Sequence, residues 1–514
     1  MYYGVMKWLA SRNILILIGI LYLSQVAASE VSRSPSFDLL DPRLPQHDLS
    51  LLYRLQISSG EFGDPNFDIL NLPEQTGFNK QILNYLRRAK PYRIKFAGDD
   101  FRIAAGFRFK EDWLGFTEDD IQYASLHSSI TLSGKIIIKD KLEIYHDLTI
   151  FRGDSSVNLE NASTTGEYLV DPLLSFNYSH RGAIASDFDV FELQTDRAII
   201  KTELFGIGIQ TGRNRVQLKR GYRAGLMLSG LTRPVDMIYR LDYNFWRFGF
   251  TALTGQLTEA GPFVDKSNRY ISVKRATFNL AHNLQVGLTE AVTYDNDPTA
   301  YINPIMLFYI VHRHRSDNDD NLIASFDFSY TPITNLNIYG ELLDDDLIIF
   351  EGGASKYGFL LGLFKTRLFS EKLDLRMEYA HVRKWTYTHV SHVNTWEYRD
   401  LPFGFWLGPD ADELYLRLNY LFTARTDLSA NFDYVRKGEG NLQMPWEDEQ
   451  GNKKPPFPSG TVEKSTGAWF DFHHEFSRFV FRARAGYRQI ENRHNNLPED
   501  FNNYFAHLVM SYNL

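Results

Sequence analysis

The sequence predicts an all-β fold: a transmembrane antiparallel β-barrel of about 18 strands, preceded by a signal peptide and a short helical segment. Three observations lead to this prediction. From about residue 100 onward, stretches of about ten residues alternate apolar and polar side chains, which is the period of a strand with two different faces. Short connections between these stretches alternate with long ones. After residue 30 the chain has no run of about 20 apolar residues, so a bundle of membrane-spanning helices is excluded.

The composition narrows the classes of function. Among 514 residues, 55 Lys and Arg oppose 63 Asp and Glu, which gives a net charge of −8 at neutral pH, and there is no cysteine. A basic nucleic-acid binder, a disulfide-linked scaffold and a cysteine-ligated metal site are therefore excluded. Apolar residues make up 44% of the chain, which is enough to bury a large surface and to exclude disorder. We expect no cofactor, no metal and no nucleic-acid partner.

The N-terminus has the features of a secretory signal peptide. Lys7 and Arg12 precede an apolar stretch over 14–23, and small residues follow at 26–28. This order of charged, apolar and small residues predicts that residues 1–28 are a signal peptide and that the mature protein leaves the cytoplasm. A membrane anchor is the alternative, but an apolar stretch of about 10 to 12 residues is too short to span a bilayer.

Residues 29–98 are expected to form a periplasmic helical segment or plug. After Pro42 and Pro45, apolar residues recur at helical spacing from Asp48 and again from Asn79, each of which can cap a helix. We therefore predict two short amphipathic helices. Because they precede the first strand, they should lie against or inside the periplasmic mouth of the barrel. A loose leader is the alternative.

Residues 99–514 are expected to form the outer-membrane β-barrel itself. The short turns all follow even-numbered strands, and the long connections all follow odd-numbered ones. Bacterial outer-membrane barrels have this asymmetry of short periplasmic turns and long extracellular loops, whereas a soluble β-sandwich has no reason to keep it. The last strand places Leu508, Met510, Tyr512 and Leu514 on one face, as a barrel-closing strand does. The predicted strands are 101–110, 127–138, 141–152, 197–204, 205–212, 235–244, 246–257, 268–280, 283–294, 324–331, 336–343, 358–367, 372–386, 413–422, 427–437, 466–476, 478–490 and 504–514.

Aromatic residues near the strand ends suit the interfacial girdles of a membrane barrel. A soluble β-protein could instead bury some of them in its core. The residues concerned are Tyr243, Phe245, Trp246, Tyr330, Trp385 and Tyr415.

Short motifs stand out at several places along the barrel. The two most extended are GIGIQTGRNR at 206–215 and GLMLSGLTRPVDMI at 225–238. Further motifs follow in the order YINPI at 301–305, SDN at 316–318, IYGELLDDD at 338–346 and LGPDADEL at 407–414. Taken in this order, the motifs resemble those of the capsule assembly Wzi family of outer-membrane proteins. The plan of signal peptide, helical segment and barrel is also similar to that of the family.

This resemblance implies a function for the chain. Such a protein would be a barrel closed by its own loops and N-terminal helices, and it would help to assemble and attach capsule or exopolysaccharide at the surface of a Gram-negative cell. The expected partners are the surface polysaccharide, the lipid and lipopolysaccharide of the outer membrane, and the barrel assembly machinery. We expect the protein to be a monomer.

Basic side chains in the long loops are the first candidates for a polysaccharide site. Surface polysaccharides are frequently anionic, and guanidinium groups bind carboxylates through paired hydrogen bonds. A local basic patch can attract a polyanion despite an adverse net charge. Contacts to lipopolysaccharide phosphates, or pairing with carboxylates of the lumen, are the alternatives. The candidates are Arg213, Arg215, Arg220, Arg223 and Arg233 in one loop and Arg313 and Arg315 in another.

A third long loop, over 387–412, is rich in aromatic rings that lie outside any predicted strand. Aromatic faces can stack on sugar rings, so Trp396, Tyr398 and Trp406 are further candidates to bind polysaccharide. The alternative is that this loop folds into the barrel as a plug.

Two other classes of function fit the same strands. A porin-like channel for sugars or small solutes would have the same turns but an open lumen. An outer-membrane hydrolase would use Ser, His and an acid, and these residue types occur between His473 and Ser477. They flank a short periplasmic turn, however, and no nucleophile elbow or nucleotide-binding motif occurs in a suitable context. We therefore predict a non-enzymatic protein that binds polysaccharide through extracellular loops, with the channel as the alternative.

Overall fold

The computed structural model describes residues 46–59, 76–86, 94–98, 100–118, 121–139, 141–155, 191–218, 220–260, 265–314, 319–345, 355–399, 401–445 and 453–513. The predicted signal peptide, residues 1–28, and Arg315 lie outside the described residues. The described helices are α2 (Gln46–Ser58), α3 (Gly77–Leu86) and α6 (Phe308–His314), with 3-10 turns η4 (His392–Asn394) and η5 (Arg493–Asn495).

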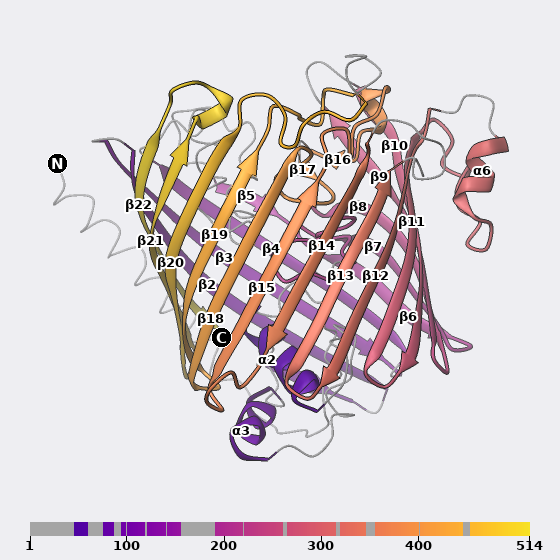
Figure 1. The fold of residues 1–514 in the computed structure, drawn as a ribbon. Coiled ribbons are helices and arrows are strands. Elements are labelled where there is room, and N and C mark those ends of the chain that lie inside the picture. The colour runs from indigo at the N-terminus through magenta and orange to yellow at the C-terminus, as the bar shows by residue number, and fades with distance from the viewer. Residues whose placement is uncertain are drawn as a thin grey trace.

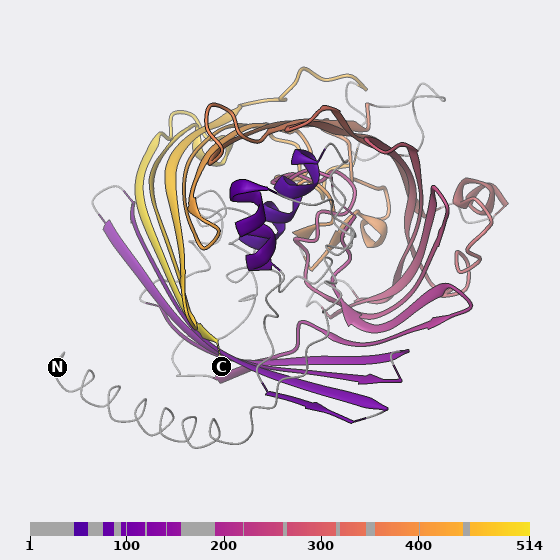
Figure 2. The same cartoon turned by 90° about the horizontal axis from the view of Figure 1, so that it is seen from below.

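The described strands form one closed antiparallel barrel, seen from the side in Figure 1 and from below in Figure 2. Neighbouring strands of the barrel pair in sequence order, and β22 pairs with β2 to close the sheet. β5 and β6 both pair with β4 and are two parts of one strand, while β1 extends the edge of β2 beside β22. Counted in this way, eighteen strands of the described residues form the barrel, which confirms the predicted fold class.

The strand bounds follow the predicted segments in order. The barrel strands are β1 (Ile94–Ala97), β2 (Phe101–Glu118), β3 (Ile121–Ile138), β4 (Leu142–Ser155), β5 (Phe191–Gln194), β6 (Ala198–Leu204), β7 (Ile207–Asn214), β8 (Val235–Phe245), β9 (Phe248–Ala260), β10 (Asp265–Ala281), β11 (Leu284–Asp295), β12 (Asn321–Ile333), β13 (Leu336–Asp345), β14 (Tyr357–Lys365), β15 (Leu373–Val382), β18 (Ala411–Thr423), β19 (Thr426–Lys437), β20 (Glu463–Phe476), β21 (Phe479–Glu491) and β22 (Phe501–Asn513). A separate small ribbon joins β16 (Glu397–Tyr398) to β17 (Leu401–Pro402).

The first two long strands, β2 and β3, extend further than the sequence predicts. Most of 111–126, expected to be a long connection, continues the two strands. The physical reason is Glu111, which follows Phe109 on the outward face and interrupts the apolar alternation there. The Glu111 carboxylate accepts a hydrogen bond of 2.8 Å from the Ser128 hydroxyl on β3, so the charged side chain is partnered within the sheet.

The two faces of the strands meet different environments. On β14, Phe359 and Leu361 point outward and remain exposed, whereas Leu360 between them points into the lumen and is buried. On β15, the lumen face carries the buried charged residues Arg376 and Glu378. An apolar outer surface around a polar lumen is the arrangement that a lipid bilayer requires of a barrel.

The aromatic girdle is only partly as predicted. Trp385 and Tyr415 were expected in it, but both are buried. Tyr415 faces the lumen, where its ring stacks on Trp469 with centroids 6.2 Å apart, and Trp385 lies in a loop after β15 with the Lys384 ammonium over its ring. The predicted girdle residues that are exposed, all close to short turns, are Tyr243, Phe245, Trp246 and Tyr330.

The N-terminal helices α2 and α3 lie at the end of the barrel that carries the short turns (Figure 1). The Arg54 guanidinium of α2 forms an ion pair of 2.8 Å with Asp374 near the start of β15. The backbone N–H of Asn335, in the turn between β12 and β13, donates to the carbonyl oxygen of Ile57. Viewed from below, both helices lie within the ring of strands (Figure 2). None of the described helices is long and apolar enough to span a membrane.

Candidate functional site

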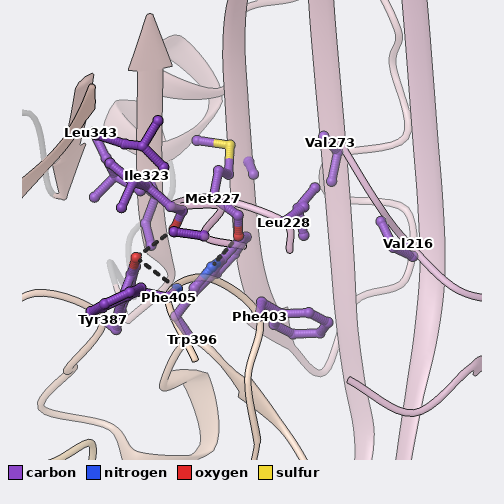
Figure 3. Packing of buried hydrophobic residues seen from close by; sticks show 14 of the residues in the cluster. Val216, Met227, Leu228, Val273, Ile323, Leu343, Tyr387, Trp396, Phe403 and Phe405 are labelled. Atoms are coloured by element: carbon purple, nitrogen blue, oxygen red, sulfur yellow. Dashed lines mark hydrogen bonds between the residues drawn. The ribbon is translucent and has the colours of Figure 1, made fainter. Parts of the chain in front are cut away.

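Two of the long loops fold into the lumen and pack against each other. Loop A comprises the described residues 215–218 and 220–234, and loop B comprises 383–399 and 401–410. Their buried apolar side chains form a cluster with lumen-facing residues of the wall, including Val273, Ile323 and Leu343 (Figure 3). The part of the lumen near the long-loop end is therefore filled by protein.

Loop A is held to the wall by two buried glutamates. The Glu378 carboxylate of β15 accepts hydrogen bonds from three successive backbone N–H groups of loop A, those of residues 222, 223 and 224. The Glu341 carboxylate of β13 accepts from the N–H groups of Leu226 and Met227, at 2.9 and 3.0 Å. A loop inside a barrel has no strand partner for its N–H groups, and these carboxylates supply the missing acceptors.

Loop B is hydrogen-bonded both to the wall, where the Tyr387 N–H donates to Asp345, and to loop A. The Tyr387 hydroxyl donates to the carbonyl oxygen of Leu226, and the Trp396 indole N–H donates to that of Met227 at 2.9 Å (Figure 3). Gly404 lies so close to Leu226 that a Cβ atom added at position 404 would be only 2.1 Å from the Leu226 carbonyl oxygen. The two loops therefore form a single packed plug, which matches the alternative considered for the aromatic loop.

Two of the predicted basic residues lie inside the barrel, where they form ion pairs with carboxylates of the wall. The Arg220 side chain is buried and forms an ion pair of 2.5 Å with Asp327 of β12. Arg223 is also buried, contacts Glu413, and forms an ion pair of 2.7 Å with Asp433. Arg220 and Arg223 are therefore paired with lumen carboxylates, which was one of the alternatives considered for the basic residues.

Of the three predicted aromatic residues, two are buried and one is partly exposed. Trp396 and Tyr398 are fully buried, and the Tyr398 ring stacks on Phe403 with centroids 6.2 Å apart. Trp406 is partly exposed, and its indole N–H donates to the Glu413 carboxylate at 2.9 Å. Of these three rings, only that of Trp406 keeps surface that a sugar could reach.

Other cations meet at the long-loop end, where β7 ends and β8 begins. Arg213 pairs with Asp236, and Arg399 of loop B lies 3.5 Å from the same carboxylate. Arg215 lies 3.4 Å from Asp196. We call Arg213, Arg215 and Arg399 the upper arginine cluster; their side chains are 23%, 11% and 31% exposed.

The three guanidinium groups of the upper arginine cluster contact the carboxylates of Asp236 and Asp196, and the charge of Asp147 also acts on Arg213 and Arg215. Burial lowers the pKa of Arg215 to about 10, which still leaves the group charged at neutral pH. Arg399 was missed in the sequence because a single Arg beside Tyr398 does not stand out as a basic patch. Arg233, which was predicted, is also partly exposed.

Arg313 is the predicted residue that lies farthest from this region. It is exposed on α6, which lies outside the barrel wall, and its Nε donates to the Tyr309 hydroxyl at 3.2 Å (Figure 1). The structure therefore does not bring Arg313 together with the upper arginine cluster.

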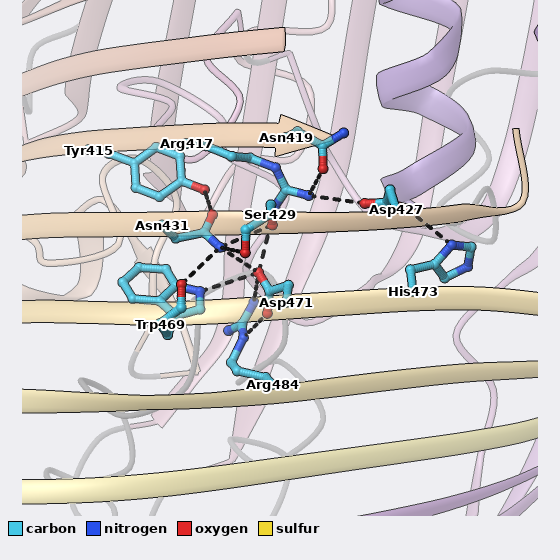
Figure 4. A network of polar contacts seen from close by, with 10 residues as sticks. All are labelled: Tyr415, Arg417, Asn419, Asp427, Ser429, Asn431, Trp469, Asp471, His473 and Arg484. Carbon is cyan, nitrogen blue, oxygen red and sulfur yellow. Dashed lines mark hydrogen bonds and ion pairs between the residues drawn. The ribbon is translucent and has the colours of Figure 1, made fainter. Parts of the chain in front are cut away.

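Further down, the lumen wall of β18 to β21 carries a network of charged and polar side chains (Figure 4). In it, Arg484 donates to Asp471, and Arg417 lies within 3.7 Å of both Asp471 and Asp427. His473, considered above for a hydrolase, pairs with Asp427 at 3.3 Å, while Ser477 occupies the turn between β20 and β21 with a left-handed φ of 53°.

An antiparallel barrel with an apolar outer surface, a polar lumen and loops folded inward is the structure of an outer-membrane β-barrel protein with a plug. The model of the capsule assembly protein Wzi family matches residues 90–503, so the chain belongs to that family. The protein lies in the outer membrane of a Gram-negative bacterium. No curated protein sequence matches the chain.

The chain is similar to several solved structures. The chain resembles Wzi of Escherichia coli, described as an outer-membrane protein involved in group 1 capsule assembly and a carbohydrate-binding β-barrel, with 12% identity, a TM-score of 0.56, and coverage of 93% of this chain and 98% of that one. OprD of Pseudomonas aeruginosa has 7% identity, a TM-score of 0.47 and coverage of 80% and 93%. OccAB1 of Acinetobacter baumannii has 9% identity, a TM-score of 0.46 and coverage of 80% and 97%.

Proposed function

We propose that this protein helps to assemble capsule or exopolysaccharide and to attach it at the cell surface, without enzymatic activity, by binding the polysaccharide through its extracellular loops. Membership of the Wzi family supports the role in capsule assembly. The related structure from Escherichia coli is described as a carbohydrate-binding barrel, which supports binding as the activity.

The plug is the observation that favours binding over transport. Loops A and B occupy the lumen toward one end, and α2 and α3 lie at the other end (Figure 1). A channel for sugars must keep an aqueous path, whereas a binding protein benefits from loops held rigidly by buried carboxylates. The Glu341 and Glu378 contacts give loop A that rigidity.

We place the binding surface at the upper arginine cluster, with Arg233 and Trp406 as further contacts. Guanidinium groups match the geometry of sugar carboxylates, so an acidic polysaccharide is the class of ligand that this surface suits. Arg220, Arg223, Trp396 and Tyr398 would then act by positioning the loops, because their side chains are buried.

Binding of the full-length protein to purified acidic capsular polysaccharide tests this proposal. Replacing Arg399 by Ala should weaken binding about tenfold, because one charge-assisted contact contributes roughly 1.5 kcal/mol or more. The same change at Arg213 should add to the loss and reduce the dependence of affinity on salt. Arg247→Ala is the matched control, since Arg247 is exposed at a short turn on the opposite end. Unchanged affinity in the Arg213→Ala/Arg399→Ala double variant would overturn the assignment of the site.

A further inference from the structure

One long loop does not enter the lumen but folds back over the outside of the barrel. We call residues 296–314 the outer segment; it ends with α6, which lies outside the ring of strands in both views (Figure 1, Figure 2). The backbone N–H of Phe308 donates to the Glu290 carboxylate of β11 at 3.1 Å. The Lys274 ammonium of β10 donates to the carbonyl oxygen of Met306 and lies 3.8 Å from the centre of the Phe308 ring.

Both wall residues that the outer segment contacts point away from the lumen. On β11, Thr289 and Thr293 face the lumen, because the first accepts a hydrogen bond from a lumen arginine and the second donates to a carbonyl oxygen of loop B. Glu290 alternates with them and shares the outward face with Leu288, which is 53% exposed. Lys274 is the cross-strand partner of Glu290 and shares that face.

The height of Glu290 can be estimated from barrel geometry. A strand tilted by about 40° rises about 2.6 Å per residue along the membrane normal, so the apolar band of about 25 Å spans nine or ten residues. Counted from Leu284 at the short-turn end of β11, this band reaches about Thr293. Glu290 therefore lies within the part of the wall that faces lipid.

Charged side chains at such positions need a partner. A bare Lys or Arg on the lipid face costs up to about 2–4 kcal/mol at the middle of the bilayer and less toward its surface. The outer segment supplies a carbonyl oxygen and a ring to Lys274 and an N–H group to Glu290. The outer segment is also held by Tyr301, whose ring centroid lies 4.9 Å from that of Tyr294 on β11 and 5.3 Å from that of Phe308.

Between residues 302 and 310 the outer segment exposes several apolar side chains, whereas its beginning at 296–299 exposes mostly polar ones. Ile305 is 88% exposed and lies next to Met306, at the level of Lys274. The last turn of α6 adds basic residues at the end of the segment. The exposed apolar residues are Ile302, Ile305, Leu307 and Ile310, and the exposed basic ones are Arg313 and His314.

We propose that the outer segment is a lipopolysaccharide-binding element of the outer leaflet. Ile305 and Leu307 insert among acyl chains, and Arg313 binds a phosphate of the headgroup, since apolar and basic surfaces adjoin in the order that an anionic lipid requires. Arg313 then contacts lipid rather than capsule. This inference does not depend on the proposed polysaccharide binding.

Because the chain has no cysteine, single spin labels test the insertion directly. We would label Ile305→Cys and Leu307→Cys in the full-length protein, reconstituted in vesicles that contain lipopolysaccharide. Leu288→Cys on the outer wall is the lipid-exposed control, and Leu497→Cys, 72% exposed in the connection between β21 and β22, is the water-exposed control. We expect both test labels to be accessible to oxygen and shielded from a water-soluble relaxant, as at position 288.

Two results would overturn the proposal. One is accessibility of the test labels to the water-soluble relaxant, as at position 497. The other is shielding from both reagents, which would show that protein covers this face. The headgroup contact is tested by Arg313→Ala, which should lower the amount of phosphorylated lipopolysaccharide that copurifies by about twofold to fivefold, the range for one partly exposed ion pair. Equal retention of dephosphorylated and phosphorylated lipopolysaccharide by the unaltered protein would remove Arg313 from the site.

Discussion

Glu378 is the residue whose loss should open the plug. Its carboxylate accepts hydrogen bonds from the backbone N–H groups of Tyr222, Arg223 and Ala224, and one of 2.6 Å from the Tyr339 hydroxyl. The side chain is buried, so water cannot easily replace it as an acceptor. Replacing Glu378 by Ala therefore leaves three loop A N–H groups without their partner.

The size of the effect follows from these contacts. A hydrogen bond to a charged group contributes roughly 1.5–3 kcal/mol, and bonds that share one acceptor are less than additive. We expect Glu378→Ala to lower the free energy of docking of loop A by about 4 kcal/mol. The equilibrium population of the undocked, open plug would then rise nearly a thousandfold. Glu378→Gln keeps an acceptor oxygen but loses the charge, so its cost should be about half as large.

Single-channel conductance of the refolded full-length barrel is the assay. The unaltered protein should be silent, Glu378→Ala should show frequent openings, and Glu378→Gln should lie between them. Glu203→Ala, which removes an exposed carboxylate of β6, is the matched control and should be silent. Faster hydrogen exchange of the Arg223 amide should accompany the openings. If Glu378→Ala folds yet remains silent with that amide still protected, the carboxylate does not hold the plug.

Three further changes test how the plug and the helices are held. Gly404→Val would place a side chain against the Leu226 carbonyl oxygen, so we expect a loss of about 1–3 kcal/mol in packing of the two loops and faster proteolysis of loop B, and unchanged proteolysis would contradict this. Arg54→Ala leaves Asp374 buried without its ion pair and should cost about 3–5 kcal/mol of α2 docking, seen as loss of exchange protection confined to α2 and α3. Trp396→Ala should lower the free energy of unfolding in urea by about 3–5 kcal/mol, and a change below 1 kcal/mol would mean that the indole is not part of the packed plug.

Much of the fold could be predicted because its signals are local. Alternation with a period of two residues marks each strand, and the regular exchange of short and long connections places the strands in a barrel. The prediction was wrong where one residue breaks the local pattern, as Glu111 does by pointing a carboxylate outward in mid-strand. It was also wrong for Tyr415, whose position near a strand end gave no sign that its ring faces the lumen.

The sequence by itself thus determined the strands, their closure into a barrel and the family. Only the tertiary structure decided where the loops go, and with them the roles of the arginines. Arg220 and Arg223 look like the other basic residues of their loop in the sequence, but the Asp327 and Asp433 carboxylates that pair with them lie 107 and 210 residues away in the chain. A loop's position depends on such distant partners and on the lumen or lipid that surrounds it, and neither is encoded in the spacing of neighbouring residues.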